Sequence, residues 1–192
     1  MIVLVVSAGC VAHVDLHAPP PSLTADERVA WFQSFAAADE ITTTRTCRKC
    51  FPTVEKELRL HNGTRIHAAE DLAPLVEPSS PTAQHARASM RARENGEHWR
   101  ELAAAVFGAA LITAVATDHV DPFVDRTSAA IWGPAAVVAL FATVAAYDDD
   151  KEATREAGRA FGTFTQDLAS RLDVCVRGLQ VAPCEHEAVA GR

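Results

Sequence analysis

Two uncharged apolar runs dominate the pattern of hydrophobic and polar positions. Residues 102–117 carry no charged side chain over 16 positions, and residues 127–147 carry none over 21. A polar link, residues 118–126, separates them. At 1.5 Å per residue the runs would form helices about 24 and 31 Å long, close to the roughly 30 Å hydrocarbon thickness of a bilayer. The pattern predicts an antiparallel helical hairpin over residues 102–147 with an apolar tip.

Two environments suit such a hairpin. In lipid, small residues such as Ala104 and Gly108, four positions apart, let helices approach closely. In water, helices that are apolar all round can form the buried centre of a bundle. The length of the second run favours the membrane. Gly133 and Pro134 leave a further alternative, because a helix that began at Gly133 would be too short to span.

Helical signals continue on both sides of the hairpin. We expect one helix over residues 81–117, because Ser80 and Pro81 suit its N-cap and first position. A second helix over residues 128–177 should follow the link. It would carry an amphipathic series of apolar residues from Phe161 to Leu179.

Pairing these two helices in antiparallel order should bring small residues together. Gly158 would lie opposite Ala86, and Gly162 opposite Ala83. Such small-residue faces also offer a surface to a protein partner or to a second copy of the chain.

Shorter elements should precede the hairpin. Thr24 and Glu27 form a capping box that predicts a helix of about 14 residues. A loop or short extended piece should follow at residues 42–44, then a helix through His61 and a turn or two of helix over residues 68–76. The predicted fold class is therefore all-α, with short N-terminal helices packed on the hairpin.

We expect one helical domain over residues 24–182 and a C-terminal tail over residues 183–192. With 48% apolar and only 6% aromatic residues, the composition favours helix over sheet. The net charge of −7 argues against a nucleic-acid partner, because phosphate binding needs a basic surface.

The first ten residues, MIVLVVSAGC, form a short apolar run that ends in small residues before Cys10. This segment, residues 1–10, resembles the signal and lipobox of bacterial lipoproteins. The resemblance implies that Cys10 is acylated and becomes the first mature residue. No Lys or Arg precedes the run, so we expect the natural start upstream of Met1. The alternative is a buried strand or helix start with a core cysteine.

The proline-rich segment that follows, residues 11–23, is expected to be an extended tether between the lipid and the fold. His13 and His17 are spaced to meet a metal in a helix, but beside three prolines we expect them to face water. Glu70 and Asp71 are expected to complement a helix dipole rather than to act as catalysts.

Four more cysteines are disulfide candidates: Cys47, Cys50, Cys175 and Cys184. Folding the hairpin should gather them at one end, where an oxidising compartment would form bridges. Two bridges between the 47/50 pair and the 175/184 pair would close long loops and contribute roughly 2 to 5 kcal/mol each. Four cysteines allow three pairings, and the sequence does not choose among them.

Two other roles remain open for Cys47 and Cys50. Zinc could bind them, with Cys184, Glu185 and His186 as a source of further ligands. A redox dithiol is the second role, because Arg48 and Lys49 would favour a reactive thiolate.

These patterns favour a lipid-anchored helical protein of the bacterial cell envelope, with most of the chain periplasmic. It would act as a structural or binding component of a membrane assembly, with membrane lipid as a partner and neither catalysis nor a cofactor. No hydrolase, metalloprotease or nucleotide-binding motif is present. The alanine-rich hairpin is also similar to the insertion hairpin of pore-forming colicins, which implies a pore-forming or toxin-like alternative.

Overall fold

The computed structural model describes residues 13–45, 53–117, 126–178 and 180–184. Its helices are α1 (Ala25–Phe35), the 3-10 helix η1 (Ala69–Leu75), α2 (Pro81–Ala116) and α3 (Arg126–Leu172). Its strands are β1 (Ala37–Arg45), β2 (Thr53–Leu60), β3 (Arg65–Ile66), β4 (Val174–Arg177) and β5 (Gln180–Pro183).

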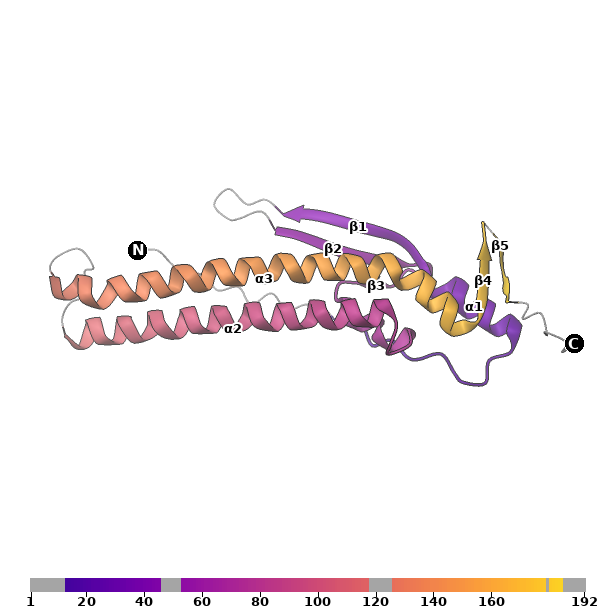
Figure 1. The fold of residues 1–192 in the computed structure, drawn as a ribbon, viewed down its shortest axis with the longest axis horizontal. Coiled ribbons are helices and arrows are strands. Elements are labelled where there is room, and N and C mark those ends of the chain that lie inside the picture. The colour runs from indigo at the N-terminus through magenta and orange to yellow at the C-terminus, as the bar shows by residue number, and fades with distance from the viewer. Residues whose placement is uncertain (1–12, 46–52, 118–125, 179, 185–192) are drawn as a thin grey trace, which may run out of the picture. The chain divides into compact units, whose positions relative to one another are not determined.

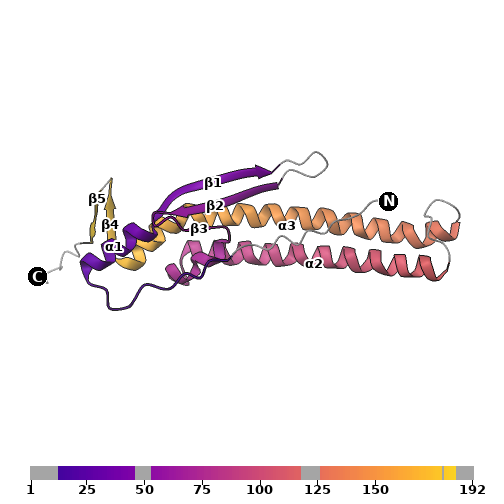
Figure 2. The same ribbon diagram turned by 180° about the vertical axis from the view of Figure 1, so that it is seen from behind.

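The long antiparallel hairpin of α2 and α3 is confirmed, and the two helices run side by side in both Figure 1 and Figure 2. Helix α2 begins at Pro81 as predicted. Helix α3 begins at Arg126 and passes through Pro134 without ending. A start at Gly133 is therefore excluded, and the whole second apolar run is helical.

The chain divides into two compact units. The described residues of unit 1 are 91–117 and 126–153, and those of unit 2 are 13–45, 53–90, 154–178 and 180–184. Both long helices contribute to each unit. Unit 1 thus contains the apolar stretches of α2 and α3 with their charged borders, and all the described strands and short helices lie in unit 2.

Unit 2 has a conventional hydrophobic core. Phe164 and Leu168 of α3 are fully buried in one cluster with Leu58 and Leu60 of β2 and with Leu72 of η1. Large apolar side chains from helix and strand thus fill the interior, as in water-soluble domains.

The fold is mostly helical, as predicted, but it is not purely all-α. Two small antiparallel sheets are present, one ordered β1–β2–β3 and the other β4–β5. Residues 53–60, predicted as helix, form strand β2. Their pattern alternates, so that Leu58 and Leu60 are buried while Arg59 between them is exposed. Gly63, expected to end a helix, instead makes the turn between β2 and β3 with a φ of 87°.

The prediction that the second long helix continues to residue 177 was also wrong. Helix α3 ends at Leu172, and Asp173 follows with a φ of 56°. Strands β4 and β5 then form a hairpin, with Gly178 at φ 62° in its turn. Cys175 and Val176 therefore lie on a strand and not on the amphipathic helix.

Helix α1 carries the predicted capping box. The Thr24 hydroxyl accepts from the Glu27 N–H, and the Glu27 carboxylate accepts from the Thr24 N–H at 2.8 Å. The backbone hydrogen bond from Thr24 is the largest influence that lowers the pKa of Glu27. The helix has 11 residues rather than about 14, because Ala36 is already extended and leads directly into β1.

The predicted register of the long helices holds in unit 2. The hydroxyls of Thr82 and Thr163 lie 2.8 Å apart, one residue from the expected pairing of Ala83 with Gly162. The glycine contacts differ from the prediction. A Cβ at Gly158 would collide with the stem of Lys56, and one at Gly162 would meet open space.

Alanines make the small-residue contact instead. Ala83 and Ala86 of α2 are buried in the same cluster as Ala157 and Ala160 of α3.

Candidate functional site

The fully buried part of the contact between α2 and α3 in unit 1 is made of small side chains, and beside it the half-buried rings of Phe107 and Trp132 pack on each other with 5.6 Å between their centres. Every buried position in the described part of this unit is an alanine, a glycine or a serine. Helix α2 contributes Ala92, Gly96, Ala110 and Ala114, and helix α3 contributes Ser128, Ala135, Ala142, Ala146 and Ala153. We call this set the alanine seam.

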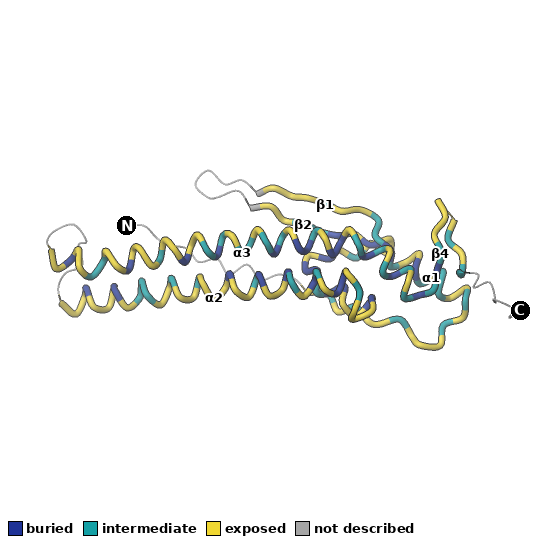
Figure 3. The backbone as a smooth tube through the Cα atoms, in the orientation of Figure 1, coloured by how far each residue is buried: buried dark blue, intermediate teal, exposed yellow. Residues whose placement is uncertain are grey.

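The alanine seam follows a seven-residue repeat. Ser128, Ala135 and Ala142 are seven residues apart, as are Ala146 and Ala153. A repeat of seven keeps the same face of a helix toward its partner. Figure 3 shows buried stretches recurring along both helices between longer exposed ones.

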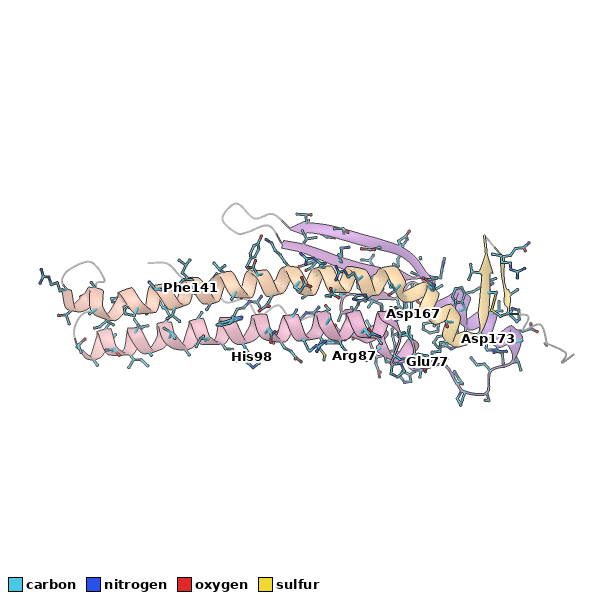
Figure 4. All side chains as sticks on the ribbon, in the orientation of Figure 1. Glu77, Arg87, His98, Phe141, Asp167 and Asp173 are labelled. Carbon is cyan, nitrogen blue, oxygen red and sulfur yellow. A yellow bond between two sulfur atoms is a disulfide. The ribbon has the colours of Figure 1, made fainter. Side chains whose placement is uncertain are left out.

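Several large apolar side chains of unit 1 are exposed. Ile112 and Val115 of α2 are 72% and 61% exposed, and Leu140 and Phe141 of α3 are 65% and 71% exposed. Figure 4 draws the side chains along the hairpin as sticks, with Phe141 labelled on α3. We call Ile112, Val115, Leu140 and Phe141, with exposed Leu111, Val137 and Val144, the outward apolar face.

This distribution is the reverse of the one in unit 2. Helix α3 buries Phe161, Phe164 and Leu168 in unit 2, whereas in unit 1 both long helices leave several large apolar side chains exposed. In water the favourable arrangement buries large apolar groups. In lipid the large groups meet acyl chains and small residues let the helices approach. In unit 1 the buried positions are small, and several large apolar side chains are exposed.

Threonine hydroxyls within the apolar runs donate to carbonyl groups of their own helices. Thr113 donates to the Ala109 carbonyl at 2.9 Å, and Thr143 donates to the Ala139 carbonyl at 2.7 Å. These threonine hydroxyls therefore have hydrogen-bond partners without water. A polar group inside a hydrocarbon layer must be satisfied in this way, because no water is present there.

A shallow apolar groove of about 310 Å³ runs between the helices of unit 1. Its lining is Val106, Ala109, Ala110 and Thr113 of α2, with Ile131, Pro134, Ala135 and Val138 of α3. The groove is open and contains no charged group among these residues, so it suits an apolar chain rather than a polar substrate.

Among the described residues, two helices are long and apolar enough to cross a membrane by length and composition alone. They are α2 and α3, whose most apolar 18-residue windows have mean hydropathies of 1.4 and 1.9. Only 11% and 17% of these windows is buried inside the protein, so neither has the protected position of a core helix.

Two of the four disulfide candidates, Cys175 and Cys184, form a disulfide, in one of the three pairings that the sequence left open. Cys175 forms a disulfide with Cys184, nine residues away, across the β4–β5 hairpin. The predicted bridges from either of these residues to the 47/50 pair are therefore wrong, because β4 and β5 place the two sulfurs within one hairpin. Cys47 and Cys50 lie outside the described residues, as does Cys10.

Residues 13–23, expected as a free tether, dock on unit 2. The Val14 N–H donates to the Asp71 carboxylate at 2.9 Å, and His13 Nδ1 lies 2.8 Å from the other Asp71 oxygen. Val14 and Leu16 also pack against the core. His17 lies 3.8 Å from Asp15 at the surface, so the two histidines do not form a metal pair.

A polar cluster stabilises the α2–α3 contact in unit 2. The buried Glu156 carboxylate lies 2.6 Å from His85 Nδ1 and also accepts from Arg159. Burial raises the pKa of Glu156, but the hydrogen bonds and charges of His85 and Arg159 outweigh it and leave the pKa below the ordinary value. The carboxylate is therefore held ionised as a structural group.

Among the described residues, no group of three His, Cys, Asp or Glu side chains lies close enough together to hold a metal ion. The polar side chains of unit 2 instead form pairs with defined structural roles. The outward apolar face and the groove of unit 1 therefore form the candidate functional site.

The sequence located the apolar hairpin but did not separate its buried face, the alanine seam, from the outward apolar face. The seven-residue spacing of Ser128, Ala135 and Ala142 was the sequence signal for the buried face, and Leu140 and Phe141 lie one or two positions away from it.

Comparison with protein-family models, with characterised proteins and with solved structures finds no match for this chain.

Proposed function

We propose that this chain is a lipid-anchored helical protein of the bacterial cell envelope, whose α2–α3 hairpin lies in the membrane. Most of the remaining chain would be periplasmic. The protein would act as a structural or binding component of a membrane assembly and would catalyse no reaction.

One observation carries this proposal: unit 1 buries only alanine, glycine and serine among its described residues while it exposes large apolar side chains. A contiguous apolar surface of this kind is unfavourable in water and marks a membrane or protein contact. Because the small residues already pair within the hairpin, lipid or a partner protein would meet the outward apolar face.

The disulfide supports the proposed periplasmic location of unit 2. Disulfides persist in the periplasm and outside the cell, whereas thiols stay reduced in the cytosol. The Cys175–Cys184 bridge in unit 2 therefore agrees with a body that faces an oxidising compartment.

Vesicle flotation tests the membrane contact. The full chain with Cys10→Ser, which removes the proposed acylation site, should float with phospholipid vesicles and resist alkaline extraction. Replacing Ile112, Val115, Leu140 and Phe141 by Gln should abolish flotation while helical circular dichroism is retained, because all four side chains are exposed.

A matched control replaces Val54 and Val176 by Gln, since these exposed apolar residues lie in unit 2. The control should float like the unmodified chain. A Cys10→Ser chain that stays in solution as a folded monomer would refute the membrane proposal.

The anchor has its own test. Expressed in a bacterium with an added signal start, the chain should incorporate radiolabelled palmitate, and Cys10→Ser should not. Labelling that persists in the Cys10→Ser variant would exclude this residue as the attachment site.

A further inference from the structure

The membrane hairpin needs a defined point of entry into the lipid, and the sequence changes character sharply at one level of unit 1. Residues 102–117 and 127–147 are uncharged, whereas Arg100, Glu101 and residues 148–152 are charged. Trp99 lies on α2 just before the first run, and Tyr147 ends the second. Tryptophan and tyrosine prefer the boundary between hydrocarbon and headgroups.

Contacts between the helices put these residues at the same level. Arg100 of α2 forms an ion pair with Asp150 of α3. A Cβ added at Gly96 would lie 3.2 Å from Asp150 Oδ1 and 3.5 Å from the Ala146 carbonyl oxygen. Residues 96–100 therefore face residues 146–150, which brings Trp99 and Tyr147 to one end of the apolar surface.

The side chains at this level suit a headgroup layer. Trp99 is 41% exposed, so its indole is available to lipid. Lys151 Nζ lies 4.2 Å from the centre of the Tyr147 ring, which places a cation on the polar side of an aromatic residue. The amphipathic tryptophan thus borders a paired and charged region on one side and the outward apolar face on the other.

The distance to the far end of unit 1 matches a bilayer. Trp99 is 18 residues from Thr117 on α2, and Arg126 is 21 residues from Tyr147 on α3. These separations correspond to about 27 and 31 Å of helix, against roughly 30 Å of hydrocarbon. Arg126 and Thr117 are exposed at that far end, where polar groups would again meet headgroups.

We propose that Trp99 and Tyr147 bind the headgroup layer of one leaflet and fix the depth of the hairpin, so that Thr117 and Arg126 reach the opposite leaflet. This inference rests on the proposed membrane function and adds the depth and the lipid-contact residues. It predicts a hairpin that crosses the whole bilayer rather than one that dips into one leaflet.

The three tryptophans provide the test, because each lies at a different place. Trp99 marks the proposed boundary, and Trp132 lies 15 residues before Tyr147, about 22 Å along α3 and beyond the bilayer midplane. Trp31 lies on α1 in unit 2, stacked on Phe35 at 4.0 Å between ring centres.

Three single-tryptophan variants of the full chain would be reconstituted into phosphatidylcholine vesicles: W31F/W132F, W31F/W99F and, as the control, W99F/W132F. Part of the lipid would carry bromine, placed either near the headgroup or near the end of the acyl chains. Trp99 fluorescence should be quenched at least about twofold more by the shallow bromine than by the deep bromine. Trp132, about 7 Å beyond the midplane, should show a ratio of deep to shallow quenching at least about twofold higher than that of Trp99.

The other outcomes separate the two proposals. If Trp132 is quenched and Trp99 is either unquenched or equally deep, the depth assignment is wrong while the membrane function stands. If neither tryptophan is quenched more than Trp31, the membrane function fails and the depth assignment fails with it.

Discussion

At the scale of single residues, Glu156, a buried acid of unit 2, shows how a charge stabilises a helix pair. Glu156 is ionised between His85 and Arg159, and its pKa in the folded chain is below the ordinary 4.5. A lowered folded pKa means that the carboxylate contributes stability above about pH 4.5 and that this contribution is lost as the pH falls through the folded pKa.

Glu156→Gln should therefore lower the free energy of unfolding by about 1 to 2 kcal/mol at pH 7, because charged hydrogen bonds are replaced by a neutral one. The deficit should shrink as the pH falls below 4.5. Urea unfolding followed by circular dichroism across this range measures both effects. The exposed Glu97→Gln is the control, and an equal deficit at every pH would contradict the electrostatic explanation.

Asp71 has a different task, because it accepts from both His13 and Val14. Asp71→Ala should remove the acceptor for His13 and for the Val14 N–H and release residues 13–23 from unit 2. The free energy of unfolding should fall by about 1 to 3 kcal/mol. Limited proteolysis should then cut this segment faster. Asp15→Ala, whose side chain is 94% exposed, should leave the cleavage rate unchanged.

At the scale of elements, the alanine seam makes a prediction about size. Ala142→Leu should force α2 and α3 apart and destabilise the hairpin by about 1 to 3 kcal/mol. Ala136→Leu, at an exposed position of the same helix, should change stability by less than about 0.5 kcal/mol. Thermal unfolding in detergent micelles compares them, and equal losses would argue against close packing at the seam.

The C-terminal hairpin depends on its bridge. Replacing Cys175 and Cys184 by Ser should destabilise unit 2 by about 2 to 3 kcal/mol, the value expected for a loop of about ten residues. Val174 and Val181 pack on the core near α1, which carries Trp31. Urea unfolding followed by Trp31 fluorescence therefore measures the loss of stability. The reduced unmodified chain should behave like the double variant, and a difference between them would point to another effect of the substitutions.

The long helices could be predicted from sequence, but the strands could not. Length, uncharged composition and the Ser80–Pro81 start signal identify α2 and α3 without tertiary information. Strand β2 reads TVEKELRL, and its Glu, Lys and Leu residues are good helix formers. Its extended form depends on pairing with β1 and on burial of Leu58 and Leu60, which are contacts from outside the segment.

At the C-terminus the helical spacing continued past the real end of α3. Cys175 and Val176 fit the same three- and four-residue intervals as Phe164 and Leu168. Gly178, whose positive φ the hairpin turn requires, was the better signal.

At the scale of the whole molecule, the candidate site was only half visible in the sequence. Composition and length located an apolar hairpin and left open whether water or lipid surrounds it. The answer we propose depends on which side chains face the partner helix, and that depends on helix phase. The contrast between Phe164, fully buried in unit 2, and Phe141, exposed in unit 1, is a property of the folded chain.

The alanine seam also has a consequence for the order of assembly. A methyl side chain removes little surface from water, so α2 and α3 gain little free energy from each other at the positions of the alanine seam. Unit 2 has large side chains such as Leu58 and Phe164 to bury and can nucleate without help from the hairpin. If the hairpin lies in lipid as proposed, the periplasmic body folds by itself, and the bilayer completes the remaining turns of the two long helices.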